Sequence, residues 1–398
     1  MVRELADAAL AGLPALVQDV VELIWREEAA YHSESPVTKA DLTDSVRVNM
    51  ERMLHAFAGR SPEHPHVYDA PQATGRRRAE QHFPLEAVLH SYRLAMEAVW
   101  DRLLAESRIR GPEVREALLD HAARLWQVID RYSVSVAEAY RARESDLARR
   151  EEQRQDALLD ALIQGHGRDP SVAAEAERVL GLPREGRYVV VCAGHGSVRA
   201  RPTARSLRGH LAARHIRSVW RTELDRELGV VSLVGTSLPR IAALLSGQLE
   251  QPAGVSGAVA GLAEIGTAAH LAELALRTVP PGAVQTVVLD DRLPEALLVS
   301  APQLAARLRR SMLGRVLDLP DDEGETLLAT LRAWFHSGRS AARTAEAVHC
   351  HRNTVFNRLR RVEELTGHFL DDDRDELSYR LALAALLIQS DDRAERDR

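Results

Sequence analysis

The stretch that most constrains the fold of this chain is residues 340–367, which read SAARTAEAVHCHRNTVFNRLRRVEELTG. Ser340 predicts a helix N-cap, and the alanines that follow it predict a short helix that another helix can cross closely. Residues 349–351 predict a turn. A second helix is expected from about 352 to 366, with Gly367 as its C-terminal glycine. The stretch therefore predicts two short helices joined by a tight turn.

The second of these helices is expected to have one buried and one polar side. At 100° per residue, Val355, Leu359 and Val362 fall on one stripe and predict burial. The other side carries side chains that read base edges or hold phosphates, since Arg pairs with guanine and Asn with adenine. A helix-turn-helix places such side chains in the major groove of DNA. The expected DNA contacts are Ser340, His351, Arg352, Asn353, Thr354, Asn357, Arg358 and Arg361. The alternative is a solvated amphipathic helix with incidental arginines.

The same residues resemble a known family. HRNTVFNRLRRVEELTG is similar to the C-terminal helix-turn-helix of the PucR/CdaR family of bacterial transcription regulators, whose core reads roughly HRNTLxYRLxxIxxLTG. The preceding segment LLATLRAWFHSGRSAARTAEAVH is similar to the same module. Two positions depart from the pattern, Phe356 where a polar or basic residue is usual and Asn357 where Tyr is common. The departures concern which bases are read. Around this module, helices are expected over 302–317, 321–336 and 376–388, followed by a polar tail.

Composition places the chain among ordinary globular proteins. The 398 residues carry a formal net charge of -6, and 45% of them are hydrophobic. A DNA-binding protein needs a basic contacting face and not a basic chain. The two cysteines, Cys192 and Cys350, are expected in different domains, which favours a reducing compartment. We expect no signal peptide, no membrane span and a cytoplasmic location.

The N-terminal 140 residues are expected to be all-helical, with helices near 5–10, 14–28, 38–59 and from 84 onward. Residues 62–71 are expected to form a polar loop. The segment GRRRAEQHFPLEAVLHSYRLAMEAVW is similar to the N-terminal helical domain of RsbR-type stress regulators, and the resemblance implies a domain that senses a signal or mediates contacts. For Arg76, Arg77 and Arg78 a solvated turn is favoured over an anion site. The histidines lack ligand spacing on a shared helix face, so we expect no metal or haem site; they are His64, His66, His82 and His90.

Residues 113–164 contain no Gly and no Pro and predict one long helix. Its charged second half keeps leucines at positions 147, 158, 159 and 162. We interpret it as a connecting helix that pairs with its copy in a homodimer or higher homo-oligomer. The alternative is a charged helix that packs on its own domain.

Residues 173–290 predict alternating strands and helices in the order β-α-β-β-α-β, which is typical of a ferredoxin-like, split βαβ sandwich. Strands are expected at 188–193, 218–222, 229–234, 257–260 and 286–289. This region resembles the degenerate GGDEF-like domain of the PucR/CdaR family. The hairpin that would carry the cyclase motif reads ELDRELG, without paired glycines or an ordered acidic pair for Mg²⁺, so we expect no cyclase activity. Asp225 and Glu227 are interpreted as turn charges, and GHGSVRA at 194–200 as an ordinary turn and not a phosphate loop.

Together these patterns predict a mainly helical multidomain chain. The expected parts are a helical sensor domain at 1–140, a linker at 141–172, an α+β GGDEF-like domain at 173–295 and a helix-turn-helix domain at 300–390. The expected function is sequence-specific regulation of transcription, through double-stranded DNA and an unidentified small-molecule or protein effector. No catalytic residue, metal or cofactor is expected. The alternatives are a signalling adaptor with little DNA affinity and a nucleotide-binding enzyme with a DNA-binding tail.

Overall fold

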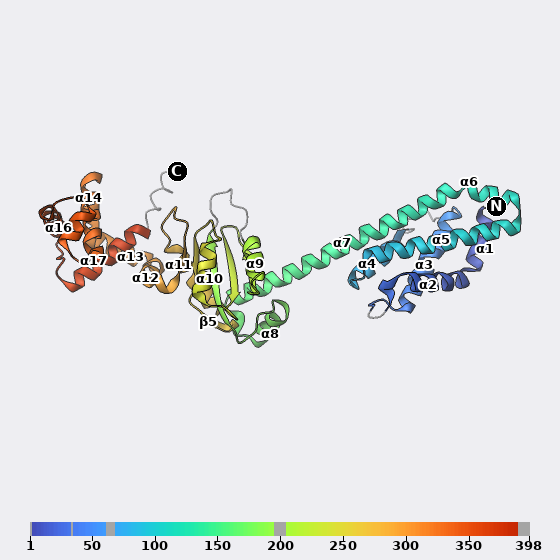
Figure 1. The fold of residues 1–398 in the computed structure, drawn as a ribbon, viewed down its shortest axis with the longest axis horizontal. Helices are drawn as coiled ribbons and strands as arrows, with labels where there is room; N and C mark the ends of the chain where they lie inside the picture. The colour runs from blue at the N-terminus through green and yellow to red at the C-terminus, as the bar shows by residue number, and fades with distance from the viewer. Residues whose placement is uncertain (1, 33–34, 61–67, 195–203, 389–398) are drawn as a thin grey trace. The chain divides into compact units, whose positions relative to one another are not determined.

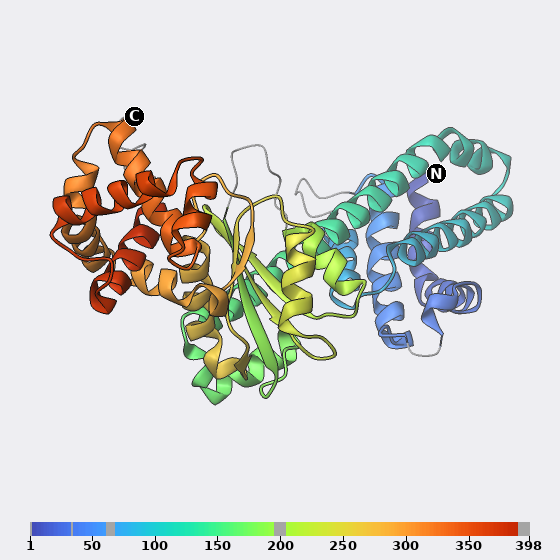
Figure 2. The same cartoon turned by 60° about the vertical axis from the view of Figure 1, so that its left-hand side comes forward.

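The computed structural model describes residues 2–32, 35–60, 68–194 and 204–388, and the chain separates into two compact units, 1–153 and 154–398. Figures 1 and 2 show the elements of each unit. His64, His66 and most of the 194–200 segment lie outside the described residues, as does the polar tail. Over the described ranges no single helix has the length and apolar character to cross a membrane, and only the bent pair α1 and α2 meets that test jointly.

The first unit is a helical domain, as expected. Its helices are α1 (Val2–Ala11), α2 (Leu13–Glu27), α3 (Lys39–Phe57), α4 (Asp69–Glu80), α5 (Leu85–Arg110), α6 (Pro112–Asp120) and the first part of α7 (Ala122–Ile163). One hydrophobic core joins them, and it includes the expected stripes of α2 and α3. The predicted cap is confirmed, because Thr38 accepts a hydrogen bond from the backbone N–H of Asp41 at 3.1 Å.

Two expectations for α4 are wrong. The segment from Asp69 is a helix and not a loop, because Pro71 lies in its first turn, where no intrahelical N–H bond is lost. The arginine triplet lies on this helix and not in a solvated turn. Arg76 and Arg77 are exposed, whereas Arg78 is buried with a relative exposure of 1%. Periodicity alone did not indicate which arginine would face the core.

The long helix expected over 113–164 is interrupted at His121. The backbone there leaves the helical region, with φ −99° and ψ 2°, and its N–H bonds back to Leu118. The side-chain Nδ1 of His121 lies 2.9 Å from the carbonyl oxygen of Ala117. Leu118 and Leu125, on either side of this break, are both fully buried in the same core. The helix is therefore interrupted without a Gly or Pro, and both sides of the break still pack in the domain.

The second unit begins with the end of α7, a turn η3 (His166–Arg168) and α8 (Pro170–Val179), and then contains a six-stranded sheet. The strands are β1 (Arg187–Gly194), β2 (Ser218–Thr222), β3 (Arg226–Ser232), β4 (Ala253–Val255), β5 (Val259–Ala260) and β6 (Thr286–Val288). The order β2-β3-β1-β4 is antiparallel throughout, as in a split βαβ sandwich, and β6 is added parallel to β4. The α+β expectation is confirmed. β4 was not predicted, because three residues are too short to show a period.

The central strand β1 is buried on both faces, as its continuous apolar run predicts. Tyr188, Val190 and Cys192 face the end of α7, α8 and α11 (Ile265–Arg277). The alternate residues face α9 (Ala204–Ala212) and α10 (Leu238–Ser246), which Figure 2 shows beside the sheet. Leu159 and Leu162 of α7 are buried in the first of these cores. These two leucines therefore pack within their own chain and not against a second copy.

Glu227 differs from its expected role. It lies in β3, opposite Ala193 of β1, with 1% of its surface exposed, and so it is not a turn charge. The strand begins at Arg226, three residues earlier than predicted, because the hairpin turn is tight and the backbone N–H of Glu223 bonds to the carbonyl of Arg226 at 2.8 Å. Asp225 is exposed, as a turn charge should be.

The C-terminal helices follow the sequence closely. They are α12 (Leu293–Ser300), α13 (Pro302–Leu317), α14 (Asp321–His336), α15 (Ala341–Ala347), α16 (Arg352–Thr366) and α17 (Asp373–Ile388). A single core joins α13, α14, α16 and α17. In this bundle α13 and α14 pack along α16, and α15 also lies against α16.

Candidate nucleic-acid interface

The two helices α15 and α16 are held by local capping. Ser340 caps α15 by accepting from the N–H of Arg343 at 3.5 Å, and His351 caps α16 through Nδ1, which accepts from the N–H of Asn353 at 3.2 Å. The turn between them contains His349 in a left-handed conformation, with φ 48°. Gly367 ends α16 at φ 76°, a conformation that favours glycine, and its N–H bonds to Glu363. The predicted helix–turn–helix boundaries are confirmed.

The buried stripe of α16 is the predicted one. Val355, Leu359 and Val362 are at most 5% exposed and pack in the C-terminal core. Because these three residues define the inner side, the outer side at 180° from Val355 carries Asn353 and Asn357. Both asparagines are exposed. The helix therefore presents amide groups to solvent from its N-terminal half, where a recognition helix contacts bases.

The remaining expected contact residues differ in how exposed they are. His351 and Arg352 are exposed at the start of α16, and Ser340 is half-buried at the start of α15. Thr354 is half-buried on the flank of α16. Because Nδ1 of His351 accepts the capping bond, the neutral ring carries its proton on Nε2, which leaves a donor for a phosphate.

Arg358 and Arg361 have partners within the chain. Arg358 is half-buried, and its Nη1 donates to Oγ1 of Thr330 on α14 at 3.3 Å. Arg361 is exposed and lies 3.7 Å from a carboxylate oxygen of Glu323. Its charge is thus partly compensated by α14, although exposed pairs of this kind are weak. These two arginines face the supporting helix more than the outer side of α16.

Arg360 was not among the expected contacts. It is exposed and lies 140° from Val355, next to the two asparagines on the outer side. Within the ranges that the structure describes, neither Arg360 nor Arg352 lies within ion-pair distance of a carboxylate. Its angle on the helical wheel already places Arg360 on the polar side from the sequence, closer to the outer side than Arg361, although only Arg361 was among the expected contacts.

Phe356 packs partly against the supporting helix α14 and is partly exposed to solvent. Its ring lies 6.4 Å from that of Trp334, edge to face, and 49% of the residue is exposed. The ring therefore packs on α14, while about half of the residue's surface stays exposed. Trp334 belongs to the core of the domain, so the contact ties the first turn of α16 to α14.

A second hydrogen-bond group fixes the end of α16. The hydroxyls of Thr366 and Tyr379 lie 2.5 Å apart, and the Tyr379 hydroxyl also donates to the carbonyl of His368 at 3.2 Å. Burial raises the pKa of Tyr379 to about 12. Tyr379 therefore stays protonated at neutral pH and can donate to His368 while it bonds to Thr366. Helix α16 is thus anchored at both ends.

Comparison with known proteins identifies the three parts of the chain. Residues 14–155 match the RsbT co-antagonist protein rsbRD N-terminal domain, residues 164–278 match the GGDEF-like domain, and residues 327–385 match the PucR C-terminal helix-turn-helix domain. An uncharacterised protein, YsfB of Bacillus subtilis (strain 168), is 33% identical over 94 residues, which is 24% of this chain and 24% of that protein.

One solved structure is also similar. It is a regulator of polyketide synthase expression from Bifidobacterium adolescentis, with 22% sequence identity and a TM-score of 0.33. The match covers 62% of this chain and 99% of that one. The protein therefore carries an RsbRD-type N-terminal domain, a GGDEF-like domain and a PucR-type helix-turn-helix domain, and the last of these points to a DNA-binding transcriptional regulator.

Proposed function

We propose that the chain regulates transcription by binding specific double-stranded DNA through the outer side of α16. The observation that carries this proposal is the grouping of Asn353, Asn357 and Arg360 opposite a fully buried stripe. Amide groups of this kind recognise adenine, and an arginine recognises guanine or a phosphate. His351 and Arg352 extend the same surface toward the N-terminus of the helix, where backbone amides also favour phosphate.

Within this surface, the contacts divide by role. We propose that Asn353 and Asn357 read bases, that Ser340, His351, Arg352 and Thr354 hold phosphates, and that Arg360 joins one or the other. Arg358 is proposed to act from the flank, since its bond to Thr330 fixes its guanidinium near α14. Arg361 is proposed to contact a phosphate after leaving its exposed pair with Glu323.

The test is a binding measurement on the full chain with DNA that it selects from a genomic fragment pool. Asn353→Ala should weaken binding to the selected site by about 1–3 kcal/mol and leave binding to unrelated DNA almost unchanged. Arg360→Ala should lower the slope of log affinity against log salt by about one unit if it holds one phosphate. Arg310→Ala, an exposed arginine on α13, is the matched control and should change neither.

The outcome also separates the regulator from a signalling adaptor. An adaptor with little DNA affinity predicts that both α16 variants behave like the control. Unchanged affinity for the selected site in Asn353→Ala and Arg360→Ala would contradict the proposal.

We also propose that the GGDEF-like domain has no cyclase activity and transmits or stabilises a signal from the N-terminal part. The hairpin supports this, because its turn is closed by the Glu223–Arg226 backbone bond and by a 2.8 Å pair between their side chains. Arg226 also pairs with Glu273 of α11 at 3.3 Å. On the hairpin where a cyclase motif is expected, a basic side chain is thus tied to two acids, and carboxylates are the groups that hold Mg²⁺. Formation of a cyclic nucleotide from GTP and Mg²⁺ by the full chain would overturn this proposal.

A further inference from the structure

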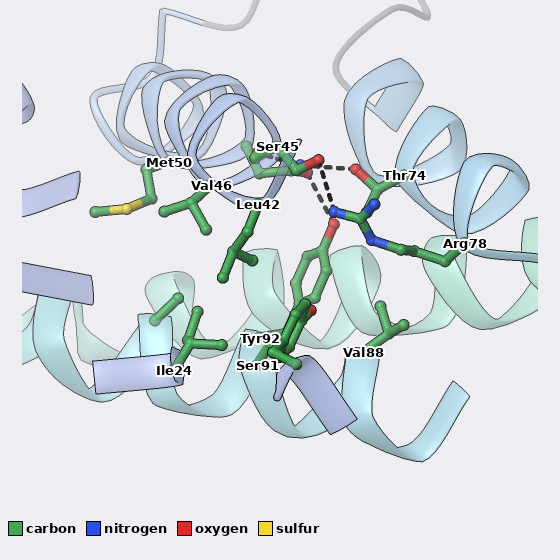
Figure 3. A pocket seen from close by; sticks show the side chains of 13 residues that line it. Ile24, Leu42, Ser45, Val46, Met50, Thr74, Arg78, Val88, Ser91 and Tyr92 are labelled. Atoms are coloured by element: carbon green, nitrogen blue, oxygen red, sulfur yellow. Dashed lines mark hydrogen bonds between the residues drawn. The ribbon is translucent and has the colours of Figure 1, made fainter. Parts of the chain in front are cut away.

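The N-terminal helical domain contains a cavity of about 50 Å³ between α2, α3, α4 and α5. Figure 3 shows its two ends. Ile24, Leu42 and Val46 form an apolar part, and Ser45, Thr74 and Arg78 form a polar part. A volume of this size accommodates roughly four water-sized atoms. A second, mainly apolar cavity of about 30 Å³ lies beside the first and shares the lining residues Asn49, Met50, Tyr92 and Ala95 with it.

The polar end contains a buried cation that no carboxylate in the described part of the chain directly pairs. Arg78 is 1% exposed, and its guanidinium donates to Gln81 at 2.7 Å, to the Ser45 hydroxyl at 3.2 Å and weakly to the carbonyl of Asp41 at 3.5 Å. The Asp41 carboxylate is bound by Arg77 instead. Two guanidinium groups therefore lie near one carboxylate, which pairs directly with the exposed Arg77, and the buried Arg78 has no direct counter-charge.

Such an arrangement is unfavourable without an anion. Burying a charge costs several kcal/mol unless an opposite charge and hydrogen bonds compensate it. Burial also lowers the pKa of Arg78, which is the direction expected of a cation that lacks a direct counter-charge. An anion in the cavity would supply that charge at the place where it is missing.

The other polar groups of the cavity are already satisfied. Asn49 donates to Thr74 at 2.9 Å and accepts from the Tyr92 hydroxyl at 2.9 Å, and the Thr74 hydroxyl donates to the carbonyl of Ala70 at 3.0 Å. The side chains of this polar group are half-buried, whereas Ile24, Leu42 and Val46 are buried. Arg78 itself is as deeply buried as these apolar side chains.

We propose that this cavity binds a short-chain monocarboxylate, with its carboxylate on the guanidinium of Arg78 beside the Ser45 hydroxyl and its alkyl tail toward Met50 and Ala95. A guanidinium can donate two parallel hydrogen bonds to the oxygens of a carboxylate, and this geometry suits a planar anion. The aliphatic lining suits a short apolar tail and disfavours a strongly hydrated inorganic anion. This proposal is independent of DNA binding, because it concerns another domain and is tested without DNA.

The test is calorimetric titration of the full chain with acetate, propionate and butyrate, up to about 10 mM, a range set by the small size of the ligands. Propionate should bind saturably, and its neutral isostere propionamide should bind at least about tenfold more weakly, since it cannot neutralise Arg78. Nitrate is the probe for an anion without a tail. Arg78→Gln should abolish propionate binding, and Arg76→Gln, the same change at an exposed position of α4, should preserve it.

A second variant keeps the proposal testable if Arg78→Gln fails to fold. Ala95 lines both cavities, so Ala95→Leu leaves the guanidinium in place and narrows the apolar end, and it should weaken butyrate more than acetate. Three results would overturn the proposal. These are no saturable binding of any of the acids, equal affinity for propionate and propionamide, or nitrate binding as tight as that of propionate.

Discussion

Single side chains of the C-terminal domain combine structural and surface roles, and Phe356 illustrates this at the start of α16. Phe356→Ala should remove the edge-to-face contact with Trp334. Because about half of the residue is exposed, the expected loss of stability is roughly 1 kcal/mol and not the full value of a buried phenylalanine. Hydrogen exchange of the α14 and α16 amides in the full chain should therefore become faster.

DNA binding by Phe356→Ala tests whether the exposed side of the residue also contacts a base. If the exposed half touches a thymine methyl group, the preference at one A·T position should also fall. Unchanged exchange together with unchanged sequence preference would mean that Phe356 contributes to neither role.

The two cysteines should differ in reactivity because their environments differ. Cys192 is fully buried in β1, and burial raises its pKa to about 12, so very little thiolate forms at pH 8. Cys350, in the turn before α16, is half-buried. A thiol reagent at pH 8 should label one cysteine of the folded chain rapidly and the second only after unfolding, and Cys350→Ser should remove the rapid phase. Rapid labelling of two thiols in the folded chain would contradict the burial of Cys192.

At the scale of elements, helix contacts in the N-terminal domain depend on one glycine. Gly75 lets α4 approach α7, because a Cβ at this position would lie 2.4 Å from the carbonyl oxygen of Val136. Gly75→Ala should destabilise the domain by about 1–3 kcal/mol, even though alanine favours a helix. Faster hydrogen exchange in α4 and in the first half of α7 would report this change.

Gly209 provides the matched control for that substitution. It lies within α9, where a Cβ added to the glycine would have no atom within 4 Å, so Gly209→Ala should be neutral or slightly stabilising. If hydrogen exchange in α4 and the first half of α7 is the same in Gly75→Ala as in Gly209→Ala, the predicted destabilisation by the added Cβ at position 75 is wrong.

For the whole molecule, we predict a homodimer that uses the charged part of α7. Leu158, Leu159 and Leu162 pack on the middle domain, whereas Leu147 belongs to none of the hydrophobic clusters of the described residues. A recognition helix makes few base contacts alone, so two copies on two half-sites reach specific affinity more readily. Sedimentation equilibrium at micromolar concentration should give twice the chain mass, and Leu147→Glu should shift it toward the monomer. A monomer for the unaltered chain would contradict the prediction.

The sequence by itself determined those features that depend on neighbours along the chain. The caps at Thr38, Ser340 and Gly367, the buried stripe of α16 and the apolar strand β1 all follow from local periodicity and from side chains a few residues apart. The same local logic predicted the exposed asparagines of the candidate interface. Because capping and amphipathicity involve residues within one or two turns, the printed sequence already contains that information.

Only the tertiary structure decided which residues meet across the chain. It placed Arg78 inside a cavity while Arg76 and Arg77 remain outside, and it turned Arg358 toward Thr330. It also broke the long helix at His121. These outcomes depend on which helix covers which face of its neighbour. Neighbouring arginines on one helix differ in burial because another helix covers only one side of that helix. Packing between distant segments therefore decided the cavity, whereas the sequence alone indicated α16 as the candidate DNA-binding helix.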